Sequence, residues 1–182
     1  MRNKAVDVRN YTFTKTDAIL PDANIWLYLC GPASLPNDWA VQAYTSVLSR
    51  ILKADSQLFL DVLVLSEFIN RFARLEMKRL QPSRTDFKAF RRSAVFPNVA
   101  TAIGVQVDLI LTICKPIDHP FSEWNHTDLL KDFVTGTVDY NDQLIAENCR
   151  KHGFAALTND RDFTEGGISV LTANNRLLAA CP

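Results

Sequence analysis

The sequence has few of the residues on which several kinds of functional site depend. Its four cysteines, Cys30, Cys114, Cys149 and Cys181, are far apart and form no CxxC pair. This spacing argues against a zinc ribbon or a disulfide scaffold, so we expect a reducing compartment. The three histidines have no metal-ligand spacing. The absence of a Gly-rich phosphate loop and of a GxSxG elbow gives no support to nucleotide-triphosphate or serine-hydrolase chemistry.

The sequence also lacks a net charge and long apolar runs. Twenty basic residues balance twenty acidic ones, so contact with a nucleic acid requires a local patch. The start, MRNKAVDVRNYTFTKTD, is too polar for a secretory signal peptide. No apolar run approaches the roughly 18 residues that cross a bilayer. We therefore expect a cytoplasmic protein with no membrane contact.

A length of 182 residues suits one domain with its own core. We expect residues 1–17 to form a polar N-terminal tail and residues 18–182 to form the domain. Short apolar segments predict strands at 18–20, 58–60, 154–158 and 168–172. Helical periodicity predicts helices starting near 25, over 40–54, from 62 to the Pro82 break, and over 86–93, 97–110, 127–133 and 139–152, with Gly153 as a C-cap and loops at 31–39 and 116–124. This alternation is typical of an α/β protein with a mostly parallel sheet and helices on both faces.

Acidic residues follow several of the predicted strands. Asp22 directly follows the first strand, and Asp160 and Asp162 follow the third. Glu67 lies in the opening turns of the helix after the second strand, and Asp142 in the first turn of the helix before the third. Because ligands bind at the carboxyl ends of the strands in such sheets, we expect these acids to gather at that edge.

A cluster of carboxylates has a predictable chemistry. Without balancing cations, the acids raise one another's pKa. Mg²⁺ or Mn²⁺ prefers such oxygen ligands and offsets the repulsion. Acidic clusters of this kind support metal-assisted phosphodiester cleavage, in which one ion activates a water and the same or a second ion stabilises the leaving oxygen.

Each acid also has an ordinary structural interpretation. Asp139 suits a helix N-cap, and Glu67 precedes Arg71 by four residues, the spacing of a surface ion pair. Asp22 and Asp162 both suit turns. Taken singly, these interpretations are the stronger ones, and the shared placement of the acids is what favours a site.

Basic residues are concentrated in one short stretch, which suits binding to a phosphate backbone. A solvated helix surface explains the stretch equally well, and both interpretations remain open. The stretch comprises Arg71, Arg74, Lys78, Arg79, Arg84, Lys88, Arg91 and Arg92. If it binds RNA, the contacts that we expect are those of Arg71, Arg74, Arg91 and Arg92.

Four segments together resemble the PIN-domain ribonucleases, including the toxin-like members of that family. They are Pro21–Trp26 (PDANIW), Leu65–Arg71 (LSEFINR), Asp139–Ala146 (DYNDQLIA) and Leu157–Phe163 (LTNDRDF). Each segment is a weak match by itself, but all four occur in family order, and the resemblance spans residues 19–172. Four motifs in order make the resemblance fairly specific.

The resemblance implies a Rossmann-like α/β/α domain that hydrolyses RNA at a Mg²⁺ or Mn²⁺ site. It also implies an antitoxin protein as partner, since many members are toxins of toxin–antitoxin pairs, and a homodimer, since these commonly dimerise. The polar lead before Ile19 departs from many small members, which begin almost at the first strand. By motif, the catalytic and metal-binding acids are Asp22, Glu67, Asp142 and Asp160, with Asp139 and Asp162 as auxiliary acids and Asn24 as a polar supporting residue.

Two functions of different classes follow from these observations. The first is a metal-dependent endoribonuclease. The second is a non-catalytic PIN-like module that binds RNA or a protein partner. The presence of all four acids favours the first. Phosphotransfer on a similar sheet is a weaker third hypothesis, because Asn24 occupies the second position of the Asp-x-Asp pair that it requires.

Overall fold

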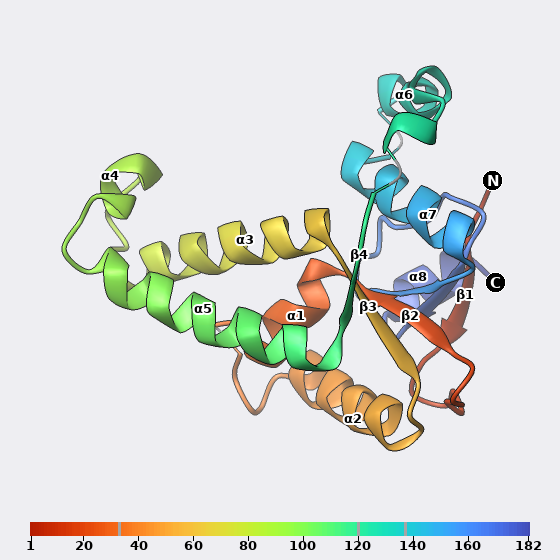
Figure 1. Ribbon diagram of the computed structural model, residues 1–182, viewed down its shortest axis with the longest axis horizontal. Helices are drawn as coiled ribbons and strands as arrows, with labels where there is room; N and C mark the ends of the chain where they lie inside the picture. Colours follow the sequence, from red (N-terminus) through yellow and green to blue (C-terminus); the bar gives the residue numbers. More distant parts are fainter. Residues whose placement is uncertain (33, 120, 137) are drawn as a thin grey trace.

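The computed structural model describes residues 1–32, 34–119, 121–136 and 138–182, and at position 132 only the backbone. Positions 33 and 120 fall in the predicted loops 31–39 and 116–124 and lie outside the described residues. In the described part of the chain, six parallel strands form one sheet in the order β1-β6-β5-β2-β3-β4 (Figure 1). The strands are β1 (Lys4–Asp7), β2 (Ala18–Pro21), β3 (Gln57–Asp61), β4 (Lys115–Ile117), β5 (Ala155–Leu157) and β6 (Ser169–Thr172). The predicted α/β fold with a short parallel sheet is confirmed.

The helices follow the predicted pattern, with ends that differ by a few residues. They are α1 (Ala23–Cys30), α2 (Trp39–Lys53), α3 (Val62–Leu80), α4 (Phe87–Arg91), α5 (Phe96–Ile113), the 3₁₀ turn η1 (Phe121–Glu123), α6 (His126–Val134), α7 (Tyr140–His152) and α8 (Asn175–Ala180). Only α8 and η1 lack a counterpart in the sequence pattern. Gly153 ends α7 in the left-handed region with φ 72°, so its predicted role as a C-cap is confirmed.

Aspartates start the helices that follow the central part of the sheet. Asp22 caps α1 and Asp61 caps α3, each accepting a hydrogen bond from a backbone N–H of its helix. Asp139 caps α7 by accepting from the backbone of Asn141 at 2.8 Å, as the sequence predicts. Because α1 and α3 begin where β2 and β3 end, their first turns lie at the carboxyl edge of the sheet.

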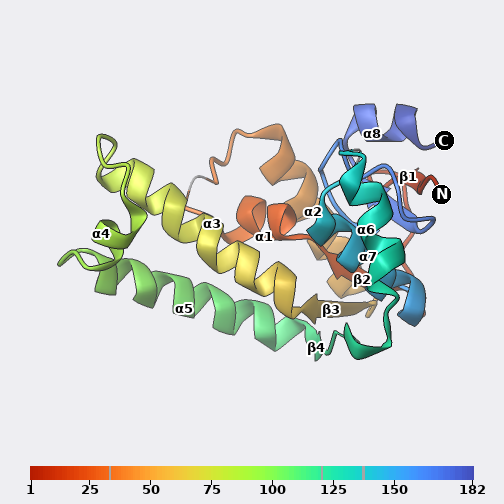
Figure 2. The same ribbon diagram turned by 90° about the horizontal axis from the view of Figure 1, so that it is seen from above.

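The helices form a layer on each face of the sheet and an arm that leaves it. Helices α1 and α2 lie on one face and α7 on the other (Figure 1). Helices α3 and α5 pack against each other and run past the end of the sheet, with α4 at the far end (Figures 1 and 2). We call these three helices the arm. Its base begins at the carboxyl end of β3, so the arm extends outward from the edge where the acids lie.

Helix α5 is the one described helix that is long and apolar enough, by length and composition, to cross a bilayer. Its 18 residues have a mean hydropathy of 1.5, and 17% of them are buried. The expectation that no apolar run approaches this length is therefore wrong. Three of its residues, Val99, Ile103 and Ile110, are buried in the arm, which makes α5 a packing helix of this domain.

The prediction that residues 1–17 form a polar tail is wrong for residues 4–8. Residues Lys4–Asp7 form β1, which pairs with β6 in the register Lys4 to Ser169 and Asp7 to Thr172, and Val8 is fully buried. Residues Lys115–Ile117 form β4, although Pro116 and Ile117 belong to the predicted loop 116–124. Both are the edge strands of the sheet, where polar residues and Pro116 are tolerated because one side of the strand needs no partner. A polar composition therefore does not exclude an edge strand.

Asn3 connects the N-terminal segment to the rest of the domain. Its buried amide donates to the carbonyl oxygens of Phe163 at 3.1 Å and Glu165 at 2.9 Å, and accepts from the backbone N–H of Ile168 at 3.1 Å. We predict that Asn3→Ala lowers the free energy of unfolding by about 2–4 kcal/mol, because three buried backbone groups lose their partner. Urea denaturation measures this change.

Asn10→Ala is the matched control for the same change of side chain. Asn10 is exposed and donates one hydrogen bond of 3.2 Å to Asp7, so its removal should cost less than about 0.5 kcal/mol. If the two variants are equally stable, the N-terminal segment is not a cooperative part of the fold.

Candidate active site

Asp22 is the buried centre of the acidic edge. It follows β2, is 8% exposed, and accepts hydrogen bonds from the backbone of Ala23 at 2.6 Å and from the hydroxyl of Thr158 at 2.9 Å. The amide of Asn24 donates to the same carboxylate. These three donors satisfy a carboxylate that has little access to water.

Asn24 and Thr158 join the ends of two neighbouring strands. The Asn24 amide donates to the Thr158 hydroxyl at 3.0 Å, and its carbonyl oxygen accepts from the backbone of Asn159 at 3.1 Å. The Thr158 hydroxyl also accepts from the backbone of Asp160 at 3.1 Å. The end of β2 and the loop after β5 are therefore fixed relative to each other, with Asp22 between them.

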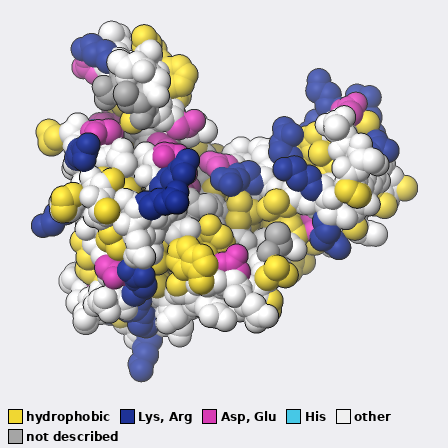
Figure 3. Space-filling view, turned by 180° about the vertical axis from the view of Figure 1, so that it is seen from behind, with side chains coloured by type: hydrophobic (Ala, Val, Ile, Leu, Met, Phe, Trp, Pro, Cys, Tyr) yellow, Lys and Arg dark blue, Asp and Glu magenta, His cyan; other side chains and the backbone are white. Residues whose placement is uncertain are grey.

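The other predicted acids line one cleft above Asp22. It has a volume of about 670 Å³ and receives side chains from α3, from α7 and its N-terminal approach, and from the loop after β5. In the space-filling view, Asp and Glu side chains gather between α6 and the arm (Figure 3). The lining residues are Glu67, Phe133, Gly136, Val138, Asp139, Asn141, Asp142, Asp160, Asp162 and Thr164. The structure thus brings five of the six acids that the sequence singles out into one cleft, and the sixth, Asp22, lies close enough for its charge to raise the pKa of Asp142.

The electrostatics of the cleft show that these acids interact. The pKa of Asp142 is raised to about 8, mainly by burial and then by the charges of Asp22, Asp160, Asp139 and Glu67, in that order. Burial is also the main cause that raises the pKa of Asp22 to about 6. The hydrogen bond from Thr158 opposes that rise, whereas the charge of Glu67 adds to it.

Two arginines lie beside the acids but do not neutralise them. Arg71 contacts Glu67 at 2.9 Å, which is the surface ion pair expected from their spacing. Arg161 lies 3.4 Å from Asp162, and both side chains are exposed. Exposed pairs of this kind contribute about 0.2–1 kcal/mol. They leave Asp22, Asp142 and Asp160 without a cation among the described residues.

The donors of the cleft fit a hard divalent cation, but they do not form a closed cage. All the charged donors are carboxylates, which Mg²⁺ and Mn²⁺ prefer. Among the described residues, no three acids or other ligands are close enough to enclose an ion. Mg²⁺ keeps several of its waters and uses one or two carboxylates, so an open cleft suits it. Among the neighbouring charges, that of Asp22 has the largest effect on the pKa of Asp142, so these two acids are candidates to share one ion.

The basic residues proposed for RNA contact lie on the arm. Arg74 and Arg91 stack on the ring of Phe87, 4.4 and 5.7 Å from its centroid, and Arg92 follows α4. The space-filling view shows Lys and Arg side chains gathered at the end of the arm (Figure 3). Arg71 lies beside the cleft, where its guanidinium donates to Glu67 at 2.9 Å. The structure therefore places one of the four arginines beside the acids and the other three farther along the arm.

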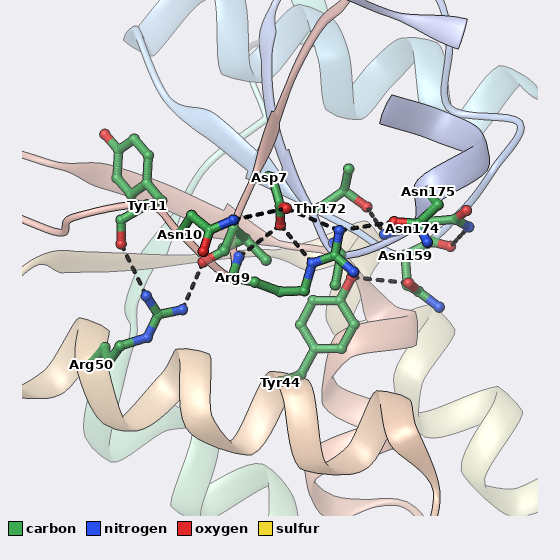
Figure 4. Close-up of polar contacts among 12 residues, drawn as sticks. Asp7, Arg9, Asn10, Tyr11, Tyr44, Arg50, Asn159, Thr172, Asn174 and Asn175 are labelled. Carbon is green, nitrogen blue, oxygen red and sulfur yellow. Dashed lines mark hydrogen bonds and ion pairs between the residues drawn. The ribbon is translucent and has the colours of Figure 1, made fainter. Parts of the chain in front are cut away.

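A hydrogen-bond network that the sequence pattern does not indicate supports the loop after β5. The single proton of the Tyr44 hydroxyl is shared between the side-chain oxygen of Asn159 at 3.0 Å (Figure 4) and the carbonyl oxygen of Thr158 at 3.2 Å. The same hydroxyl accepts from the backbone N–H of Ala173. The Asn174 amide donates to the carbonyl oxygen of Asn159 at 2.8 Å. Tyr44 fits a helical apolar stripe in the sequence, and that pattern carries no signal that its hydroxyl is used.

The raised pKa of Asp142 predicts how stability depends on pH. Its folded pKa of about 8 lies above the ordinary value of 3.8, so between these values the folded state binds a proton that the unfolded state has lost. Stability then falls as the pH rises through this window. In EDTA, we predict that Asp142→Asn raises the free energy of unfolding by about 1–3 kcal/mol at pH 8 and by nothing near pH 4. Thermal melts over this pH range measure the difference.

Asp128→Asn is the matched control, because Asp128 also lies in the first turn of a helix. It is exposed and pairs with Lys131, so its replacement should give no gain in stability at any pH. An equal gain in both variants would contradict the attribution of the effect to burial and crowding of acids.

Comparison with known proteins identifies the family. The family model described as PIN domain matches residues 19–168, a range that includes all four acidic segments. Comparison with curated proteins finds no match. Among solved structures, the chain is similar to the crystal structure of PAE2754 from Pyrobaculum aerophilum, with 16% identity, a TM-score of 0.45 and 90% of each chain covered. Because the family match covers most of the chain, the protein belongs to the PIN-domain family, whose members are generally nucleases.

Proposed function

We propose that the protein is a metal-dependent endoribonuclease that hydrolyses RNA phosphodiester bonds in the acidic cleft. The observation that carries the proposal is the convergence of Asp22, Glu67, Asp142 and Asp160. Burial and the charges of these neighbours together raise the pKa of Asp142 to about 8. A fold has no structural reason to crowd acids that destabilise it, so the cluster supports a role in binding cations.

The acids have distinct roles in this proposal. Asp22 and Asp142 bind Mg²⁺ or Mn²⁺, and Asp160 completes the coordination directly or through water. Such an ion, when bound, lowers the pKa of a water and stabilises charge on the phosphate. Glu67 orients the attacking water or binds a second ion. Asp139 and Asp162 add negative charge at the rim, and Asn24 keeps the carboxylate of Asp22 in place.

The arm contributes contacts to the RNA backbone. Arg71, Arg74, Arg91 and Arg92 supply positive charge along a path that starts at Glu67 and leads away from the cleft. Such contacts position the substrate and carry no base information. Single-stranded or looped RNA suits an open cleft, because its backbone can bend into the site.

We further propose that the protein acts in the cytoplasm as the toxin of a toxin–antitoxin pair and binds its antitoxin or a second copy of itself. The proposal of a reducing compartment is supported by the four free cysteines. A protein partner is supported by the exposed apolar side chains of Val105, Leu109 and Leu111 on α5, which are 41–54% exposed.

Replacing Asp22 tests the nuclease directly. Asp22→Asn keeps the shape and the helix cap but removes a charged ligand, so we predict a loss of Mn²⁺-dependent RNA cleavage of at least about 100-fold. A labelled oligoribonucleotide separated on a gel measures the rate. Asp38→Asn is the matched control, because Asp38 caps α2 in the same way and lies outside the cleft. A wild-type rate in Asp22→Asn would refute the mechanism.

Metal binding should also be visible without RNA. We predict that Mg²⁺ or Mn²⁺ raises the melting temperature of the wild-type protein, since it binds the folded state alone. The rise should be larger at pH 8 than at pH 6, because the metal binds carboxylates and must displace the proton that Asp142 retains. The Asp22→Asn protein should show a smaller rise at both pH values. No shift at millimolar metal would contradict a functional metal site.

The non-catalytic module is the alternative that these experiments distinguish. Such a protein would bind RNA or a protein partner but show no cleavage with either metal. The complete set of acids argues against it, because a module without catalysis gains nothing from keeping carboxylates that raise one another's pKa.

A further inference from the structure

The loop after β5 presents its side chains to two different cavities. Asp160 and Asp162 line the acidic cleft. Arg161, between them, lines a second cavity with a volume of about 390 Å³. Consecutive residues therefore place opposite charges on the two sides of one loop.

The second cavity, which we call the arginine pocket, is lined by residues from four parts of the chain. They are Arg9, Trp39, Arg161, Ala173, Asn174, Asn175 and Arg176. Of these described lining residues, three are arginines and none is an acid. Trp39, the first residue of α2, is 57% exposed. The pocket thus combines positive charge, amide groups and an exposed aromatic ring.

The three arginines differ in how far they are neutralised. Arg9 forms a bidentate pair with Asp7 at 2.8 and 2.9 Å and donates to the side-chain amide oxygen of Asn175 at 2.8 Å, which fixes its guanidinium (Figure 4). Arg161 has the long, exposed contact with Asp162. Within the described part of the chain, no ion pair involves the exposed Arg176. The pocket therefore retains positive charge that is available to a ligand.

The position of the pocket is tied to the acidic cleft. Asn174, in its wall, donates to the carbonyl oxygen of Asn159, which directly precedes Asp160. The hydroxyl of Tyr44 forms a hydrogen bond of 3.0 Å with the side-chain oxygen of Asn159 (Figure 4). A ligand in the pocket therefore lies at a fixed position beside the acids.

The order of the strands puts the pocket and the arm on opposite sides of the cleft. The acids Asp22 and Asp160 follow the central strands β2 and β5, and the arm follows β3. The pocket lies at the ends of β6 and β1, on the other side. An RNA strand that crosses the carboxyl edge of the sheet meets the basic arm, the acidic cleft and the arginine pocket in that order.

We propose that the arginine pocket is a subsite for a nucleotide of the RNA that flanks the scissile phosphate. This inference rests on the proposed ribonuclease function and adds a binding site outside the acidic cleft. Arg161 and Arg176 bind the phosphate, since guanidinium groups match its geometry with two parallel hydrogen bonds. Trp39 stacks on the base, a contact that tolerates every sequence because each base has a flat face. Arg9, held by Asp7 and Asn175, forms a rigid wall.

Binding of RNA without cleavage tests the subsite. We would measure the fluorescence anisotropy of a labelled single-stranded oligoribonucleotide with the full chain, in EDTA and over a range of salt concentrations. Arg176→Ala should weaken binding about three- to tenfold and reduce the slope of log affinity against log salt by about 0.7, the value for one lost phosphate contact on a single strand. Trp39→Ala should weaken binding about fivefold and leave the slope unchanged.

Two control variants match these changes outside the pocket. Lys115→Ala removes an exposed cation from β4, at the other edge of the sheet, and Phe121→Ala removes a ring that is also 57% exposed. Both should bind RNA within about twofold of the wild type with the same salt slope. Arg176 and Trp39 lie on separate helices, so a folding defect in one variant leaves the other as a test.

The outcomes separate this inference from the proposed function. Unchanged affinity and slope in both pocket variants overturn the subsite, whether or not the wild type cuts RNA. Weaker binding with the predicted slopes supports it. If the pocket variants show these effects but the wild type never cleaves RNA with Mn²⁺, the nuclease is refuted and the pocket stands as an RNA-binding site of a non-catalytic module.

Discussion

The repulsion among carboxylates at one edge of the sheet is the constraint on which the rest of the site depends. The chain holds Asp22 in place with hydrogen-bond donors, which come from Asn24, Thr158 and the backbone of Ala23. Donors of this kind orient a carboxylate without cancelling its charge. An arginine in the same place would have formed a buried ion pair and closed the site to any other cation. The fold therefore fixes Asp22 while leaving its carboxylate without a paired cation among the described residues.

The helices contribute to the same edge, but their effect is the smaller one. Helices α1 and α3 begin there, and α7 brings Asp142 in its first turn. The positive end of a helix dipole favours an ionised acid by about 0.3–1 kcal/mol. Burial and four neighbouring acids act in the opposite direction, and the pKa of Asp142 is raised to about 8. The net effect is a cluster of acids that repel one another, and under the proposed function a bound cation would offset this repulsion.

The acids could be predicted from the sequence because each one either directly follows a strand or lies in the opening turns of a helix. Asp22 and Asp160 directly follow apolar strands, and parallel strands bring such positions together. The arginine pocket could not be predicted in this way. Arg9 and Asn175 meet only because β1 pairs with β6, and β1 is a polar edge strand without an apolar signal. The same is true of Tyr44, whose place in an apolar stripe gives no indication that its hydroxyl supports the loop of Asp160.

The alternation of Asp160, Arg161 and Asp162 acquires a physical meaning from the two cavities that it separates. Under the proposed function, a phosphodiester is attracted to the arginine side of the loop and repelled by the acidic side. A divalent cation in the cleft reverses that repulsion, so the metal and the RNA each increase the affinity for the other, as linkage requires. The loop thus places an anion site next to a cation site, and a strand of RNA with a bound metal is the ligand that satisfies both at once.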